Sequence, residues 1–448
     1  MHSLTPEKLI LKQLDGGLII RRGTLQDTDA LVEFNAHVQA DPPTFEPDIR
    51  VGAWTRDLFT NPPPGFHPED FTIVEDPSAG KIVSSLCLIS QTWSYAGIPI
   101  KVGRPELVGT DAAYRHRGLI RDQFEIMHAW SQERGELVQA ITGIPFYYRL
   151  FGYEMCVDLG GLRAGFESQV PKLQEGEEEP YQIRTALPSD LPWIDALYGP
   201  SNQRYLLSCL RDQASWLYEL NGKSDLNVNR KQICVIQDVG GNRVGYLVLP
   251  TELWGGEYQV AMQYELSPDV SWLAVTPSVI RFLWQTGKAV EAETGKHCSG
   301  FGFSMNLNHP VYRWIDHMLP VQRPPYAWYL RVDNIPALLR TIAPVLEKHL
   351  VAGGLPGYTG EITISNYRSE IGMRFQAGSL VEVLENPWGN YYAADAAFPG
   401  TTFNHLLFGY RGINELRAVN PDISVKPDKK PIIETLFPLL PSQIWPVS

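Results

Sequence analysis

The stretch VGTDAAYRHRGLIR, residues 108–121, joins an apolar segment to a helical pattern through a basic turn. Residues 98–110 alternate or run apolar, which is typical of a strand. Beyond the turn, Ile120, Phe124 and Met127 recur at the spacing of one helix face. The sequence therefore predicts a strand, a basic turn and a helix in direct succession.

This turn has the chemistry of a pyrophosphate site. The free N–H groups of a helix's first turn point outward, and the helix dipole favours negative charge there. Gly118 allows an anion to approach the backbone closely, and Arg115, His116, Arg117 and Arg121 add side-chain charge. Arginines before a helix are equally typical of a solvated surface, so the turn alone leaves both interpretations open.

A third segment, Tyr148-x-x-x-Gly152-Tyr153, follows further along the chain. With Val108-Gly109-Thr110 and Arg115-x-x-Gly118-x-Ile120, it resembles the acetyl-CoA signature of the Gcn5-related N-acetyltransferases (GNAT). In that family the last signature position is a small residue, whereas Ile120 occupies it here. The cofactor-binding residues that the resemblance implies are Val108, Gly109, Thr110, Arg115, His116, Arg117, Gly118, Leu119, Ile120, Arg121, Gly143 and Ile144.

The resemblance also implies a mechanism in which an amine attacks the thioester of acetyl-CoA directly. Such an enzyme positions two ligands, stabilises an oxyanion and moves two protons. The backbone N–H groups of Val108 and Thr110 are the candidate oxyanion donors, and Tyr148 is the candidate general acid. Tyr148 also fits a core aromatic among Phe146, Tyr147 and Phe151.

Two composition breaks divide the 448 residues. Residues 166–179 contain proline, glycine and three consecutive glutamates, which is typical of a solvated linker. After Arg331, a short helical stretch leads to a Gly- and Pro-containing break and then to strand-like patterning. We therefore predict domains over residues 1–165, 180–330 and 335–448.

The second domain has the outline of a degenerate copy of the first. Residues 271–275 parallel the cofactor-binding strand, and residues 309–313 parallel the tyrosine segment. Thr276-Pro277-Ser278-Val279 stands where the basic turn would be, with neither glycine nor arginine. This domain is predicted to be structural support.

The third domain contains short strand patterns at residues 360–365, 371–375 and 379–384. Its residues 406–411 and 432–438 resemble the sterol-carrier-like domain that ends the enhanced intracellular survival (Eis) proteins. The predicted fold class is α/β (α+β). It comprises two tandem GNAT-like mixed-sheet domains, the second degenerate, followed by an α+β sterol-carrier-like domain.

The resemblance to Eis proteins implies that the chain's own terminal carboxylate, here that of Ser448, is the general base. A carboxylate with an ordinary pKa near 4 is a weak base unless burial raises that pKa. A frayed terminus explains Ser448 equally well. Glu106, on the strand leading to Val108, is the alternative base.

Composition limits the partners and the compartment. The formal net charge of -12 argues against a nucleic-acid surface and suits a cationic amine substrate. The five cysteines are scattered and predict buried thiols, with neither disulfides nor a metal site. Neither a membrane span nor a signal peptide is indicated, so we expect a cytoplasmic protein without membrane partners.

The acceptor is the least defined part of the prediction. Family members acetylate aminoglycosides and other polyamines, and a lysine-containing peptide is a further candidate. The proline-rich residues 42–68 are predicted to be a surface excursion, whose Phe45, Glu46, Asp48, Trp54 and Phe59 fit either a cation pocket or a solvated loop. The family implies a homohexamer. A non-catalytic acyl-CoA sensor and an apolar-ligand carrier are the alternative functions.

Overall fold

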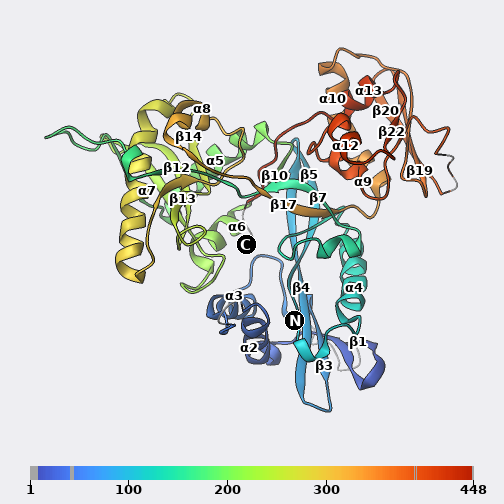
Figure 1. The fold of residues 1–448 in the computed structure, drawn as a ribbon, viewed down its shortest axis with the longest axis horizontal. Coiled ribbons are helices and arrows are strands. Elements are labelled where there is room, and N and C mark those ends of the chain that lie inside the picture. The colour runs from blue at the N-terminus through green and yellow to red at the C-terminus, as the bar shows by residue number, and fades with distance from the viewer. Residues whose placement is uncertain (1–8, 41–44, 388, 390, 446–448) are drawn as a thin grey trace.

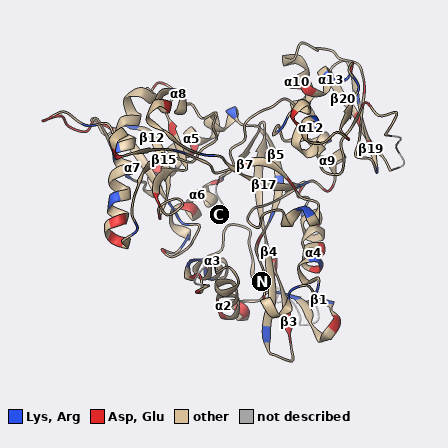
Figure 2. Ribbon diagram, in the orientation of Figure 1, with Lys and Arg blue, Asp and Glu red and all other residues tan. Residues whose placement is uncertain are grey.

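The computed structural model describes residues 9–40, 45–387, 389 and 391–445, which form three lobes (Figure 1). The first lobe carries the long central strands, the second lies on one side of them, and the third, with the C-terminal helices, lies on the other. Lys and Arg residues are dispersed over all three lobes (Figure 2). Each of the three lobes combines helices with strands, which agrees with the mixed α/β class predicted from the sequence.

The first sheet has the order β1-β2-β3-β4-β5-β6-β17-β7, with β10 paired to the end of β4. Its strands are β1 (Ile10–Gln13), β2 (Ile19–Arg22), β3 (Phe71–Asp76), β4 (Lys81–Tyr95), β5 (Ile98–Thr110), β6 (Val138–Ile141), β17 (Tyr326–Arg331), β7 (Glu154–Leu159) and β10 (Leu207–Cys209). Helices α2 (Thr28–Val38), α3 (Ile49–Thr60) and α4 (Leu119–Glu133) pack beside it.

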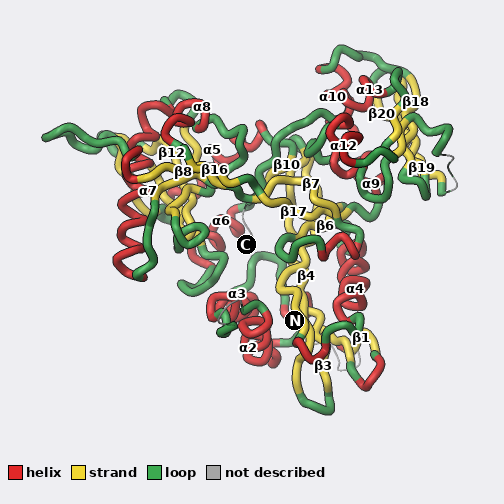
Figure 3. The backbone as a smooth tube through the Cα atoms, viewed as in Figure 1, coloured by secondary structure: helices red, strands yellow, loops and turns green. Residues whose placement is uncertain are grey.

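The hairpin of β4 and β5 forms the spine of this sheet (Figure 3). Its turn is Ala96-Gly97, where both residues have positive φ, 46° and 94°. A β-bulge interrupts the pairing near Leu107, which has a φ of 54°. The pairs between β5 and the parallel β6 are Val102 with Val138 and Gly103 with Gln139. Beyond them the two strands part.

The second lobe holds two four-stranded sheets, of order β14-β12-β11-β9 and β13-β15-β8-β16. Their strands are β9 (Tyr181–Thr185), β11 (Lys231–Asp238), β12 (Arg243–Pro250), β13 (Tyr258–Ala261), β14 (Gln263–Leu266), β15 (Gly300–Phe303), β8 (Leu162–Phe166) and β16 (Val321–Arg323). The helices are α5 (Leu191–Ser201), α6 (Gln213–Leu217), α7 (Trp272–Thr294) and α8 (Tyr312–Ile315).

The first two lobes exchange strands. The chain leaves the first lobe to place β8 between β15 and β16, and it returns to place β17 between β6 and β7. The exchanged strand fits tightly, since a Cβ atom on Gly165 would lie 2.4 Å from the Met318 carbonyl oxygen. Strand pairing between the lobes therefore crosses the two domain boundaries predicted near residues 165 and 330. The division into three domains remains a prediction.

The third lobe is a five-stranded sheet covered by helices. The sheet order is β20-β19-β18-β21-β22, with β18 (Gly360–Ser365), β19 (Glu370–Gln376), β20 (Ser379–Asn386), β21 (Ala396–Ala397) and β22 (Ser424–Val425). The helices are α9 (Ile335–Thr341), α10 (Ala343–Ala352), α11 (Phe403–Leu407), α12 (Ile413–Val419) and α13 (Lys430–Leu436). Phe403 and Leu407 of α11 share one apolar core with Val157 of β7, which joins this lobe to the first.

Two local expectations were wrong. Residues 49–60, inside the proline-rich stretch, form helix α3, because Asp48 caps it through the Arg50 and Val51 N–H groups and Trp54 faces the core. Residues 272–275 begin helix α7 rather than a strand, and Pro277 lies inside that helix. In the proline-rich stretch the prolines flank α3 rather than interrupt it.

All five cysteines are buried and unpaired, as predicted. Within the described ranges, none of the helices combines the length and apolar composition that a membrane crossing requires.

Candidate active site

A groove of about 560 Å³ opens where β5 parts from β6. Helix α4 begins at one end of it, and the end of α2 forms one wall. We call it the β5–β6 groove. Of the predicted cofactor-binding residues, the groove is lined by Val108, Gly109, Thr110, Arg115, His116, Arg117, Gly118, Leu119, Ile120, Arg121 and Ile144.

The turn between β5 and α4 has the geometry of an anion site. Gly118 is in the left-handed conformation, with φ 80°, and no heavy atom lies within 4 Å of the Cβ position it lacks. Helix α4 starts at Leu119, so the N–H groups of its first turn lie at this end of the groove. The exposed side chains of Arg115 and Arg117 flank them. This end can hold a diphosphate.

The wall formed by α2 was not foreseen from the sequence. The Gln39 side-chain amide donates to the Val108 carbonyl oxygen at 3.0 Å. A Cβ atom on Gly109 would lie 2.4 Å from Cγ1 of Val38, so the strand can approach this helix only with glycine at 109. The sequence shows a glycine at position 109, but it does not show which residue lies against that glycine.

Backbone direction along β5 matters for the groove. The Asp111 N–H donates to Val83 on β4. Because successive residues of a strand alternate in direction, the backbone groups of Thr110 and Val108 point away from β4, toward the groove. The Gln39 contact with the Val108 carbonyl agrees with this direction. The N–H groups of Val108 and Thr110 are therefore available to a ligand between the parted strands.

A smaller cavity of about 130 Å³, here called the side pocket, adjoins the groove. The two share Gln39, Val108 and Ile144 as lining residues. The other residues lining the side pocket are Val51, Trp54, Glu106, Leu107, Ile141, Thr142, Gly143 and Tyr148. The structure thus brings the predicted acid, Tyr148, and the alternative base, Glu106, to one cavity at the Val108 end of the groove.

Tyr148 lies in a short 3-10 helix, η5 (Tyr147–Phe151), and is 3% exposed. Burial raises the pKa of its phenol, and the nearby Glu106 charge raises that pKa further. The Ile144 N–H donates to the hydroxyl and opposes the shift. Tyr148 is therefore protonated at neutral pH and can give up a proton to a basic leaving group.

Glu106 is buried and forms an ion pair with Arg104, two residues earlier on the same strand. Burial raises the pKa of the Glu106 carboxyl above its ordinary value of 4.5, although the Arg104 charge opposes the shift. Arg104 is fully buried over the ring of Trp328, and its Nε and Nη1 groups have no partner among the described residues. No sequence pattern pointed to Arg104 as a neighbour of the site.

Other predicted site residues are not gathered here. Ser448 lies outside the described residues, and the chain is followed to Trp445, which is buried under the Arg211 guanidinium. Of the aromatic residues predicted for a cation pocket, Trp54 lines the side pocket, whereas Phe59 belongs to the core and Phe45 is exposed. Within the described ranges, no group of three or more His, Cys, Asp and Glu is placed to hold a metal ion.

Comparison with known proteins agrees with this geometry. Residues 20–156 match the family described as acetyltransferase (GNAT) domain. None of the curated proteins shows significant sequence similarity to the chain.

Solved structures resemble the chain over nearly its whole length. A GCN5-related N-acetyltransferase from Kribbella flavida is 16% identical, with a TM-score of 0.62 over 95% of this chain and 97% of that one. A probable N-acyltransferase from Enterococcus faecalis V583 is 12% identical, with a TM-score of 0.61 over 95% and 98%. Eis1 from Mycobacterium abscessus is 12% identical, with a TM-score of 0.58 over 95% and 98%.

The sequence match and the groove together define residues 20–156 as a GNAT acetyltransferase domain. Through this domain the chain is an acetyl-CoA-dependent GNAT acetyltransferase. Over its length it has the fold of Eis1 and of the probable N-acyltransferase from Enterococcus faecalis V583.

Gly118→Ala should weaken acetyl-CoA binding at least about tenfold, because a side chain there strains the left-handed backbone and projects toward the anion. Gly135→Ala is the matched control, since Gly135 follows the other end of α4 with φ 70° and open space around it. Isothermal titration of acetyl-CoA should show normal affinity for the Gly135 variant. Equal losses in both variants would contradict an anion site at Gly118.

Proposed function

We propose that the chain transfers the acetyl group of acetyl-CoA to a primary amine of an aminoglycoside, a polyamine or a lysine-type substrate by direct attack. The observation that carries this proposal is the meeting of Glu106 and Tyr148 in the side pocket at the Val108 end of the β5–β6 groove. A proton acceptor and a proton donor there flank the place where an amine and a thioester would meet.

Each part of the groove has a proposed task. The first-turn N–H groups of α4, with Arg115 and Arg117, hold the diphosphate, and Gly143 and Ile144 border the pantetheine. The N–H groups of Val108 and Thr110 polarise the thioester carbonyl and stabilise the oxyanion. Bound acetyl-CoA supplies the acetyl group, and Tyr148 protonates the departing sulfur.

A carboxylate is the proposed base. Ser448 remains the candidate implied by the resemblance to Eis proteins. The described tail ends at Trp445, which is buried against Arg211 and Trp216 and lines neither the groove nor the side pocket. Glu106 is supported directly by its position in the side pocket and by its raised pKa. Extending the chain beyond Ser448 separates the two candidates.

The second and third domains are proposed to support this site. In the second lobe, Trp272 at the start of α7 packs on Tyr264 and His309, with ring centroids 4.8 and 5.3 Å apart. Side chains thus occupy the start of the helix that parallels α4, which favours a degenerate GNAT-like domain. The third lobe is proposed to be sterol-carrier-like, and a homohexamer is the proposed assembly.

A thiol-release assay with acetyl-CoA against aminoglycosides, polyamines and lysine-containing peptides tests the function. We expect free CoA to form with at least one of these classes. If acetyl-CoA binds but no amine releases CoA, the chain is an acyl-CoA sensor instead. Lipid that co-purifies with the protein and is found by native mass spectrometry would support the apolar-ligand carrier.

Tyr148→Phe should lower kcat by about 10² to 10⁴-fold, the usual contribution of a general acid, and leave the acetyl-CoA affinity unchanged. Tyr147→Phe is the control, because Tyr147 lines the groove but not the side pocket. Steady-state kinetics and titration separate the two effects. An unchanged kcat in the Tyr148 variant would remove this residue from the mechanism.

The pH profile should identify the base. Glu106 is protonated below its raised pKa, so a rate that needs its charge falls as the pH drops through a midpoint above 4.5. If Glu106 is the base, Glu106→Gln should lower kcat/KM about 10² to 10⁴-fold and remove that acidic limb, while an extension past Ser448 leaves the rate unchanged. The opposite pattern would assign the role to the terminal carboxylate.

A further inference from the structure

We propose that Glu154 is a positioning residue that couples the turn carrying Tyr148 to the third lobe. The turn, residues 146–152, is here called the Tyr148 turn. The catalytic consequence of this inference rests on the proposed role of Tyr148, whereas the structural coupling can be measured independently.

The Tyr148 turn has an unusual backbone that needs outside support. Phe146, before η5, has a left-handed φ of 65°, and Gly152, after it, has φ 83°. A left-handed conformation is costly for an aromatic residue such as Phe146. The Phe146 N–H donates to the Tyr329 hydroxyl on β17 at 2.7 Å, so an exchanged strand holds this end of the turn.

Glu154 holds the other half of the turn. Arg149, the residue after Tyr148, donates to Oε1 of Glu154 through Nη2 at 2.7 Å and through Nε at 3.1 Å. The same oxygen accepts the Met155 N–H at 2.9 Å. The Glu154 side chain is 13% exposed and that of Arg149 is 37% exposed, so water screens the pair on the arginine side while the carboxylate is held by its other contacts. The position of Arg149, and with it Tyr148, therefore depends on where the Glu154 carboxylate lies.

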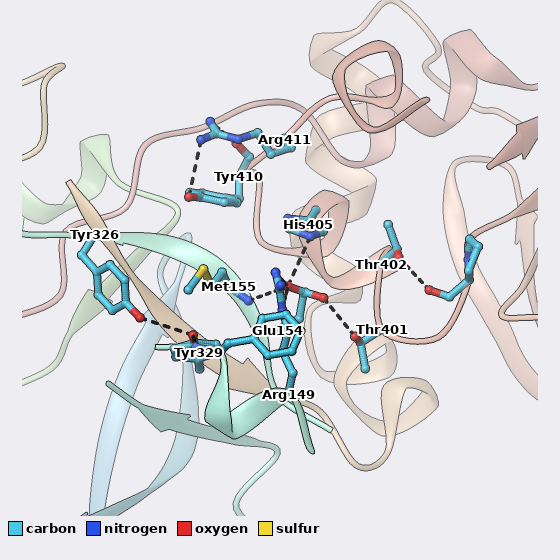
Figure 4. Close-up of polar contacts among 12 residues, drawn as sticks. Arg149, Glu154, Met155, Tyr326, Tyr329, Thr401, Thr402, His405, Tyr410 and Arg411 are labelled. Atoms are coloured by element: carbon cyan, nitrogen blue, oxygen red, sulfur yellow. Dashed lines mark hydrogen bonds and ion pairs between the residues drawn. The ribbon is translucent and has the colours of Figure 1, made fainter. Parts of the chain in front are cut away.

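The third lobe contacts the same carboxylate (Figure 4). The Thr401 hydroxyl donates to Oε2 of Glu154 at 3.4 Å, and Nε2 of His405 lies 3.8 Å from Oε1. Thr401 precedes α11 and His405 lies within it, and this helix packs its apolar face on β7. Glu154 thus contacts both the Tyr148 turn and the helix by which the third lobe docks.

His405 contributes shape rather than charge to this contact. Burial lowers the pKa of its imidazole, the Glu154 charge opposes that shift, and the Arg149 and Arg411 charges add to it. His405 also stacks on the Tyr410 ring, with centroids 5.7 Å apart. A neutral ring beside the carboxylate restricts its position without competing with Arg149 for its charge.

Displacing the carboxylate should misplace the acid. An acid that moves by about 1 Å can lose as much as about 10²-fold in rate, while cofactor binding at α4 is unaffected. Loss of Glu154 should therefore lower kcat and leave the KM for acetyl-CoA unchanged. If Glu154 were purely structural, its loss would lower the melting temperature without separating the effect on kcat from the effect on KM.

The test compares Glu154→Ala, Glu154→Gln, Thr401→Val and Tyr95→Phe in the full chain. The Tyr95 hydroxyl donates to the Leu407 carbonyl of the same helix α11 at 2.5 Å, from the β4–β5 hairpin. It is the matched control, since its loss weakens docking without contacting the Tyr148 turn. Measurements are steady-state kinetics, melting temperature and hydrogen exchange of residues 146–152.

We expect Glu154→Ala to lower kcat about tenfold and Thr401→Val about threefold, with the KM for acetyl-CoA within about twofold of wild type. Glu154→Gln should recover to within about threefold, because its amide oxygen still accepts from Arg149. Exchange across residues 146–152 should accelerate in Glu154→Ala and Thr401→Val. Tyr95→Phe should melt earlier with kcat and exchange in the turn unchanged.

Normal exchange in the Tyr148 turn of Glu154→Ala, or an equal acceleration in Tyr95→Phe, would overturn the coupling. A normal kcat in Glu154→Ala despite faster exchange would overturn the positioning role. Failure of the proposed role of Tyr148 looks different, because Tyr148→Phe would then turn over at the wild-type rate. Failure of the proposed function would leave the wild-type chain itself without amine-dependent release of CoA. Hydrogen exchange would still decide whether Glu154 couples the turn to the third lobe.

Discussion

The separation of β5 from β6 beyond Gly103 is the constraint on which the site depends. Leu107, in a left-handed conformation, forms the bulge that turns β5 away from its parallel neighbour. Backbone groups that a regular sheet would pair are thereby left for a ligand, and the side pocket opens beside the bulge. The start of α4 faces this opening because the chain runs from Thr110 through one short turn into that helix.

Burial sets the proton chemistry of the side pocket. The same removal from water raises the pKa of the Tyr148 phenol, which keeps its proton, and of the Glu106 carboxyl, which becomes a stronger base. The Arg104 charge limits this rise in the pKa of the Glu106 carboxyl. The proposed acid and the proposed base therefore line one pocket, whose apolar lining includes Trp54 and Ile141.

The sequence could predict what is local in the chain. The strand, the basic turn and α4 follow from spacing and from Gly118, and the position of Tyr148 follows from its distance to Gly152. Contacts made across the fold were out of reach, because Gln39 meets a residue 69 positions away and Phe146 meets one 183 positions away. No periodicity in the sequence encodes such pairs. Helix α3 was missed for a related reason, because the prolines around it suggested a loop and the core contact of Trp54 could not be seen from the sequence.

The exchanged strands affect how this protein is made. When a ribosome has released residues 1–165, β6 and β7 exist but the strand that lies between them has not been synthesised. The nascent sheet then presents two unpaired edges until residues 326–331 emerge, and such edges invite association with other chains. Because the chain is synthesised from its N-terminus, the first lobe cannot complete its sheet until the second lobe has been made. The cellular yield should therefore depend on chaperones that shield those edges and on the translation speed across residues 166–331.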